Sequence, residues 1–141
     1  METVRSSEGW KTAAVLVARL VMAAMFAMAC VFKFSGIAMT AQYISSAGFP
    51  MATALAWLAA FFELGLVICF LSGAFFREAC LLAAAYVIFL AFAFHGPSHW
   101  TDPAMLEFGA FVSHFPFAAG LLFGAVHGPG PVLSMKAGLL R

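Results

Sequence analysis

The hydrophobic pattern divides the chain into four long apolar runs separated by shorter, more polar connections. The runs cover residues 13–34, 52–71, 79–95 and 107–126. Each is close to the roughly 20 residues that a helix needs to cross the hydrocarbon core of a bilayer. None alternates apolar and polar positions as a strand does, and a bilayer offers bare backbone no hydrogen-bond partners. The pattern therefore predicts an all-α fold, an integral membrane four-helix bundle that forms a single membrane domain over residues 1–141.

Composition indicates the same class of protein. Apolar residues make up 65% of the 141 and charged residues 9%, and the mean hydropathy of +1.02 is far above that of soluble globular proteins. The formal net charge of +1 leaves no basic surface large enough to hold a nucleic acid. The lipid bilayer is thus the first expected partner. The three cysteines have no C-x-x-C spacing, so they suggest no zinc site.

The positive charges predict which side of the membrane the termini face. With four spans both termini share a side, and that side collects Arg5, Lys11, Arg77, Lys136 and Arg141. The opposite connections, residues 36–51 and 95–102, contain no lysine or arginine. Because cytoplasmic loops are enriched in these residues, we expect the termini in the cytoplasm. The two opposite connections, which are long enough to carry structure of their own, then face the outside or the periplasm.

Ionisable side chains in the first two spans lie on faces that can meet. In the second span, Glu63 shares a face with four alanines between residues 52 and 60, and small residues of this kind let helices approach closely. In the first span, Arg19 and Lys33 share one stripe at helical spacing. A carboxylate near the bilayer midplane must be neutralised by protonation or by a partner. Both cations are candidates to pair with Glu63, and Arg19 is equally consistent with snorkelling to the cytoplasmic boundary.

Further ionisable residues fall in the outer half of the bundle. The third span ends at His95, and the fourth opens with Glu107 and carries His114 on the same face. At a rise of 1.5 Å per residue, Glu63 lies roughly 15 to 20 Å below the outer boundary, His114 roughly 10 to 12 Å, and the other groups, Lys33 included, within about 6 Å. These five residues from four helices, with phenylalanine-rich walls, suit a flat apolar ligand such as a quinone head group.

Several short motifs follow one another in a specific order along nearly the whole chain. They are Arg19, FKF around Lys33, AGFP at 47–50, ELGLVICFLSG at 63–73, Arg77, His95 and GPGPVLS at 128–134. This order resembles the DoxX family of small four-helix membrane proteins. By the resemblance, the five single residues Arg19, Lys33, Glu63, Arg77 and His95 correspond to the recurrent polar positions of the family. The chain departs from the family at Cys30, where a glycine is common, and at Ser113 and His114, where a Lys-Asn pair is common.

The resemblance implies a quinone-linked neighbourhood, because the family takes its name from a subunit linked to a terminal quinol oxidase and to thiosulfate:quinone oxidoreductase. We therefore expect a multi-pass protein of the bacterial or archaeal cytoplasmic (inner) membrane. The favoured hypothesis is a membrane subunit of a redox system that binds a quinone-like ligand in the outer half of the bundle. Glu63 and His114 are the candidate catalytic residues. The candidate ligand-binding residues are Arg19, Lys33, Glu63, His95, Glu107 and His114.

The sequence leaves other functions open. It contains no haem-attachment motif, no iron–sulfur cysteine set and no dinucleotide fingerprint, so any electron carrier must come from a membrane or periplasmic partner protein. One alternative is a non-enzymatic anchor or assembly protein whose charges only specify helix pairing. Another is metal or haem ligation by His95, His99 and His114. Transport is disfavoured by only four spans, although a homo-oligomer would supply more.

Overall fold

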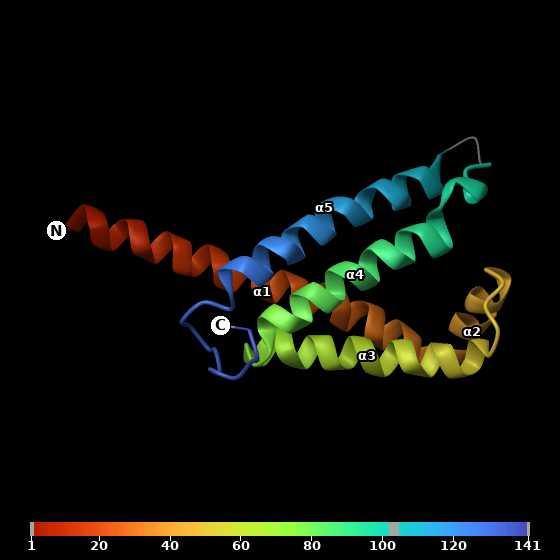
Figure 1. Ribbon diagram of the computed structural model, residues 1–141, viewed down its shortest axis with the longest axis horizontal. Coiled ribbons are helices and arrows are strands. Elements are labelled where there is room, and N and C mark those ends of the chain that lie inside the picture. The colour runs from red at the N-terminus through yellow and green to blue at the C-terminus, as the bar shows by residue number, and fades with distance from the viewer. Residues whose placement is uncertain (1, 102–104, 141) are drawn as a thin grey trace.

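The computed structural model describes the backbone of residues 2–101 and 105–140 and the side chains of residues 9–101 and 105–140. The described part of the chain is helical and contains no strand (Figure 1). Its elements are α1 (Glu2–Ser35), α2 (Ile37–Ser46), α3 (Ala52–Ser72), α4 (Phe76–His95), the 3₁₀ turn η1 (Pro97–His99) and α5 (Leu106–His127). Helices α3, α4, α5 and residues Gly9–Ser35 of α1 are each long and apolar enough to cross a membrane. The prediction of four membrane helices is confirmed.

The helices associate as two groups that diverge toward one end of the molecule. Helix α1 packs along α3, and α4 packs along α5, whereas contacts between the two pairs are fewer. Figure 1 shows α3 and α4 close together at the turn that joins them and apart at their other ends, where α2 lies. Where the pairs meet, Phe26 of α1 contacts both Phe70 of α3 and Phe117 of α5, each with ring centroids 5.6 Å apart. The bundle is thus packed at this level and open toward α2.

The alanine-rich face of α3 packs inward as the sequence predicts. Ala56 and Ala60 are fully buried, and Glu63 is 1% exposed on the same face. Small side chains here allow α1 to lie close to α3, because no bulky group separates the two backbones. Hydrophobic side chains on the opposite faces remain exposed, as expected for helices whose outer surface is solvated by lipid. The inward orientation of Glu63 is confirmed.

Helix α4 begins at Phe76, three residues before the start that the apolar run predicts. Gly73 ends α3 with φ of 74°, and Phe75 takes φ of 51° immediately before α4. These two positive-φ residues reverse the chain within a few residues, and glycine adopts such a conformation at little cost. The hydropathy pattern misses the first turn of α4 because Arg77 and Glu78 are polar. Their side chains bind backbone at this end of the bundle instead of entering lipid.

The segment after α5 folds back over the ends of the helices. Its backbone pairs with the α3–α4 turn, since Met135 N–H donates to Ser72 O at 2.9 Å and Phe75 N–H donates to Ala137 O at 2.7 Å. Arg19 of α1 donates to Pro129 O at 2.8 Å and to Leu133 O at 2.7 Å. Arg19 is 2% exposed, so it neither snorkels to water nor pairs with Glu63. A folded C-terminal segment supplies the carbonyl partners that the sequence analysis did not anticipate.

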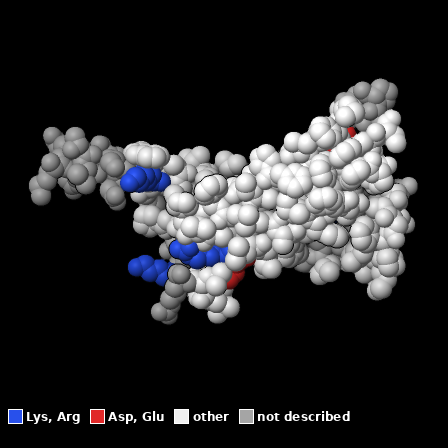
Figure 2. Space-filling view, turned by 45° about the horizontal axis from the view of Figure 1, so that its top comes forward, with Lys and Arg blue, Asp and Glu red and all other residues white. Residues whose placement is uncertain are grey.

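Both termini lie at the same end of the molecule, as four spans require (Figure 1). The lysine and arginine side chains that are visible in Figure 2 lie at this end. Lys11, Arg77 and Lys136 are the described members of the predicted set; the side chain of Arg5, and Arg141, lie outside the described residues. The cytoplasmic orientation of this end stays a prediction.

A fusion experiment tests that orientation. Green fluorescent protein joined after residue 141 is expected to fluoresce, because the positive charges retain this end in the cytoplasm. Alkaline phosphatase inserted between Ser98 and His99 is expected to be active, since that turn would face the periplasm. A dark C-terminal fusion together with an inactive insertion at the turn would reverse the assigned topology.

Candidate ligand pocket

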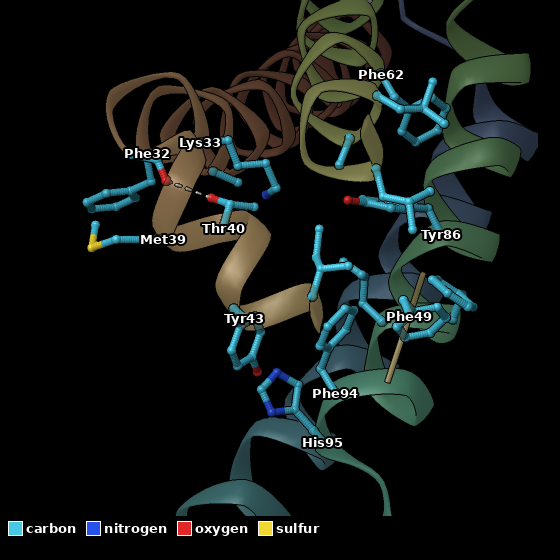
Figure 3. Close-up of a pocket in the computed structure, with 18 of the residues that line it drawn as sticks. Phe32, Lys33, Met39, Thr40, Tyr43, Phe49, Phe62, Tyr86, Phe94 and His95 are labelled. Carbon is cyan, nitrogen blue, oxygen red and sulfur yellow. Dashed lines mark hydrogen bonds between the residues drawn. The ribbon is translucent and has the colours of Figure 1, made fainter. Parts of the chain in front are cut away.

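A cavity of about 850 Å³ lies between the two groups of helices at their diverging end. Side chains from α1, α2, α3, α4 and α5 all line it, and most are aromatic or aliphatic. The polar side chains at its wall are Lys33, Thr40, Tyr43, Tyr86, His95 and His114. Figure 3 shows the first five of these groups, Lys33 to His95, approaching the cavity from different helices. An apolar chamber with a few convergent polar groups is the usual form of a small-molecule site.

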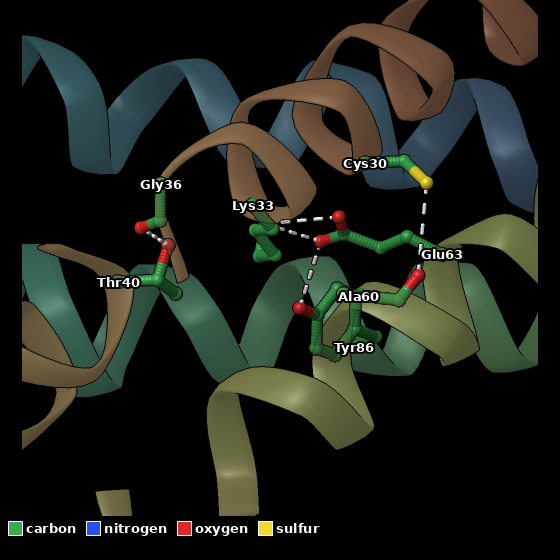
Figure 4. A network of polar contacts seen from close by, with 7 residues as sticks. All are labelled: Cys30, Lys33, Gly36, Thr40, Ala60, Glu63 and Tyr86. Atoms are coloured by element: carbon green, nitrogen blue, oxygen red, sulfur yellow. Dashed lines mark hydrogen bonds and ion pairs between the residues drawn. The ribbon is translucent and has the colours of Figure 1, made fainter. Parts of the chain in front are cut away.

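The deep polar group of the pocket consists of Lys33, Glu63 and Tyr86. Lys33 Nζ donates to Glu63 Oε1 at 2.8 Å and to Oε2 at 2.9 Å, and Tyr86 Oη donates to Oε1 at 2.9 Å (Figure 4). The Glu63 side chain is 2% exposed and that of Lys33 is 20% exposed. Because Lys33 and Tyr86 line the cavity and Glu63 does not, the carboxylate lies behind the two groups that face a ligand. Of the two cations predicted as partners, the structure selects Lys33.

Local packing fixes the orientation of this group. The ring of Phe62 meets that of Tyr86 edge to face with centroids 5.0 Å apart, which orients the phenol between α3 and α4. Cys30 lies one turn before Lys33, and its Sγ is 3.7 Å from Ala60 O, so α1 and α3 are in close contact beside the ion pair. A buried ion pair is stable only when its hydrogen bonds are satisfied, and here two donor groups make three hydrogen bonds to one carboxylate.

The second polar group joins α4 and α5 at the end of the bundle opposite the termini. His95 Nδ1 is 2.7 Å from Glu107 Oε2, and the rings of His95 and His114 have centroids 5.2 Å apart. His114 Nδ1 is also 2.7 Å from Ala110 O, one turn back along its own helix. His95 and His114 line the cavity, whereas Glu107 holds His95 from outside it. The structure thus divides the predicted constellation into two groups at different levels of one pocket.

A comparison with known families decides what kind of protein this is. The sequence matches the DoxX family over residues 14–96, which is more than half of the chain. The chain belongs to the DoxX family. The match contains Lys33, Glu63, Tyr86 and His95, while His114 falls after its end. No curated protein and no solved structure matches the chain.

In this DoxX-family chain the first outer connection folds into α2, which closes one side of the pocket. Tyr43 stacks on Phe94 of α4 with ring centroids 5.0 Å apart, and Thr40 Oγ1 donates to Gly36 O at 3.2 Å. Burial, and to a lesser degree the charge of Glu107, raises the pKa of Tyr43, so its hydroxyl stays protonated at neutral pH. Sequence reasoning missed Tyr43 and Tyr86, although a tyrosine within an apolar run is a signal that could have found Tyr86.

Two of the candidate residues, Arg19 and His99, are not part of the cavity wall in the DoxX-family chain. Arg19 does not line the pocket, because its guanidinium holds the C-terminal segment. His99 lies on η1 and is not part of the pocket wall. Within residues 9–101 and 105–140, no group of three or more histidine, cysteine or acidic side chains is placed to hold a metal ion.

The DoxX-family pocket is lined partly by side chains that reach the outer surface of the bundle. Phe32 is 69% exposed, Met39 73% and Leu58 65%, and all three belong to the cavity wall. Exposed apolar side chains of membrane helices face acyl chains, so the rim of the cavity at Phe32 and Leu58 would open toward lipid. A ligand dissolved in the bilayer would reach Lys33 and Tyr86 without crossing water.

Proposed function

We propose that this DoxX-family chain is a membrane subunit of a redox system that binds a quinone-like molecule in the pocket between its helix pairs. It would do so in the bacterial or archaeal cytoplasmic membrane. A partner subunit would supply the electron carrier, since the chain contains no haem-attachment, iron–sulfur or dinucleotide motif. The observation that supports this most is the apolar chamber itself, which would open toward lipid at its rim and ends at an ion pair.

The size and walls of the chamber fit such a ligand. Its volume of about 850 Å³ lies in the upper part of the range for small-molecule sites, roughly 300 to 1,000 Å³, and accommodates a ring together with part of an apolar tail. Phe49, Phe62, Phe89 and Phe94 supply flat surfaces against which a ring can stack. Most of the remaining wall is aliphatic. The ligand is therefore expected to be flat and lipid-soluble.

Two polar groups would meet the oxygen atoms of the ligand and handle protons. Bound quinone supplies reversible two-electron, two-proton chemistry. Lys33 Nζ would hydrogen-bond a ring oxygen at the deep end, and Glu63 would hold the ammonium in place and stabilise its charge. His95, oriented by Glu107, and His114 lie at the other end of the cavity, where their ring nitrogens can donate or accept a hydrogen bond. We add Tyr86 to the proposed ligand-binding residues. Glu63 does not line the cavity, so it would act on the ligand through Lys33 and Tyr86.

The proposal predicts that filling the pocket abolishes ligand binding. Ala59 lines the cavity, and replacing it with tryptophan places an indole inside the chamber. The purified Ala59→Trp variant in lipid nanodiscs is expected to bind decylubiquinone at least 30-fold more weakly than the wild type, about 2 kcal/mol, because the ring and the indole would overlap. Equilibrium titration of the two proteins measures the difference.

Ala85→Trp is the matched control, because Ala85 is exposed on α4 and does not line the cavity. Its affinity is expected to stay within twofold of the wild type. Saturable binding that survives Ala59→Trp would place the ligand elsewhere. An absence of saturable binding to the wild type would favour the anchor or assembly function, for which the Lys33–Glu63 pair is a structural contact between α1 and α3.

A further inference from the structure

We infer that the deep end of the pocket recognises a hydroxyl group and so binds the reduced, quinol form of its ligand in preference to the quinone. This inference rests on the proposed function and names the form of the ligand that the site selects. It follows from counting the hydrogen-bond donors and acceptors that Lys33 and Tyr86 present to the cavity. Figure 3 shows these two side chains entering the cavity from opposite sides.

Tyr86 presents an acceptor to the ligand. A phenol has one proton to donate and lone pairs that accept. The proton of Tyr86 is committed to Glu63 Oε1 at 2.9 Å. The side chain nevertheless lines the cavity opposite Lys33 (Figure 3), so a ligand group placed between the two would meet only the lone pairs of its oxygen. A group that donates a hydrogen bond fits this position, whereas a carbonyl oxygen placed there would face another set of lone pairs.

Lys33 presents a donor beside that acceptor. An ammonium has three protons, and two of them are directed to Glu63 Oε1 and Oε2. The third proton is available to the cavity, which Lys33 also lines. Because Glu63 balances the charge of Lys33, the pair is formally neutral and does not select for an anionic ligand. The deep end therefore offers one donor and one acceptor without net charge.

A hydroxyl group satisfies both positions at once. Its oxygen accepts from Lys33 Nζ while its proton is donated to Tyr86 Oη. A quinone oxygen can accept from Lys33 but has no proton for Tyr86, which leaves a buried acceptor unpaired. One such hydrogen bond corresponds to roughly a tenfold difference in affinity. For a two-electron couple, a tenfold tighter binding of the reduced form raises the midpoint potential of the bound ligand by about 30 mV.

Anaerobic binding of decylubiquinol and decylubiquinone to the wild-type protein in nanodiscs tests the inference directly. The quinol is expected to bind about tenfold more tightly than the quinone. In Tyr86→Phe the quinol is expected to lose that advantage, because the acceptor is removed. The affinity for the quinone is expected to stay within about twofold, because Lys33, which meets the quinone oxygen, keeps both of its hydrogen bonds to Glu63. Ser113→Ala is the control: it removes an exposed hydroxyl of α5 that does not line the cavity and is expected to keep the preference.

The outcomes separate this inference from the function on which it rests. If neither form binds saturably to the wild type, the proposed function fails. If both bind with equal affinity, the pocket is a ligand site but hydroxyl recognition is overturned. If the preference persists in a folded Tyr86→Phe protein, the assignment to Tyr86 is overturned. The comparison of quinol and quinone affinity in the wild-type protein tests hydroxyl recognition even if the variant does not fold.

Discussion

Replacing Lys33 with methionine is expected to lower the free energy of unfolding by about 3 kcal/mol. The change leaves Glu63 buried without its cation, and removal of one partner of a buried pair typically costs 3 to 5 kcal/mol. We expect a cost at the lower end of this range because 20% of the Lys33 side chain is exposed and Tyr86 still donates to the carboxylate. Reversible denaturation in mixed detergent micelles, compared with the wild type, measures the loss.

The double variant Lys33→Met, Glu63→Leu is the control for charge burial. It removes both members of the pair, and apolar replacements of a buried pair are often neutral or stabilising. We expect it to recover at least half of the stability that the single change removes. Equal losses in the single and double variants would show that packing at Lys33, and not the unpaired carboxylate, causes the destabilisation. Recovery of stability without recovery of ligand binding would separate the structural role of the pair from its role in the pocket.

Replacing Arg19 with methionine is expected to release the C-terminal segment from the helix ends. The change removes two charge-assisted hydrogen bonds, to Pro129 O and Leu133 O, each of which contributes roughly 1.5 to 3 kcal/mol. Arg19 Nε is buried without a partner, so removing the guanidinium also relieves a desolvation cost. The net loss is expected to be about 3 kcal/mol, localised to this segment.

Tryptic cleavage after Lys136 reports the release. This residue is exposed, but its neighbours Met135 and Ala137 are paired to the α3–α4 turn, so cleavage requires local opening. Cleavage is expected to be at least tenfold faster in Arg19→Met than in the wild type. Lys11→Gln, which changes an exposed cation of the same helix, is expected to leave the rate unchanged. An unchanged rate in Arg19→Met would show that the backbone pairs hold the segment without the arginine.

The sequence could predict that Glu63 is buried but could not identify its partner. The alanines of α3 mark the close-packed face, and Glu63 falls on it. Arg19 and Lys33 lie on the same stripe of α1 but are 14 residues apart, about 21 Å along the helix, so one carboxylate can reach only one of them. Which one depends on how far α1 and α3 are shifted relative to each other. That shift follows from the path of α2 and from packing around Phe26, which hydropathy does not encode.

The group formed by His95, Glu107 and His114 shows a second limit of prediction from the sequence. His95 and Glu107 end and begin adjacent helices, so their proximity follows from chain connectivity. The pocket between this group and Lys33 does not follow from chain connectivity, because it forms where α1 and α3 separate from α4 and α5. Tyr86 completes it from a position whose neighbours in sequence are apolar, and Tyr43 from a connection outside the four apolar runs. A side chain is recognisable as part of such a site only when the groups it faces are known.

By itself, the sequence determined the membrane class, the four helices, the inward face of α3 and the resemblance to the DoxX family. These properties depend on hydrophobicity, helical period and motif order, which are local and additive along the chain. The tertiary structure alone decided that Lys33 neutralises Glu63, that Arg19 holds the C-terminal segment, and that an apolar chamber lies between the helix pairs. These depend on the distances between side chains of different helices, which are set only when the helices pack.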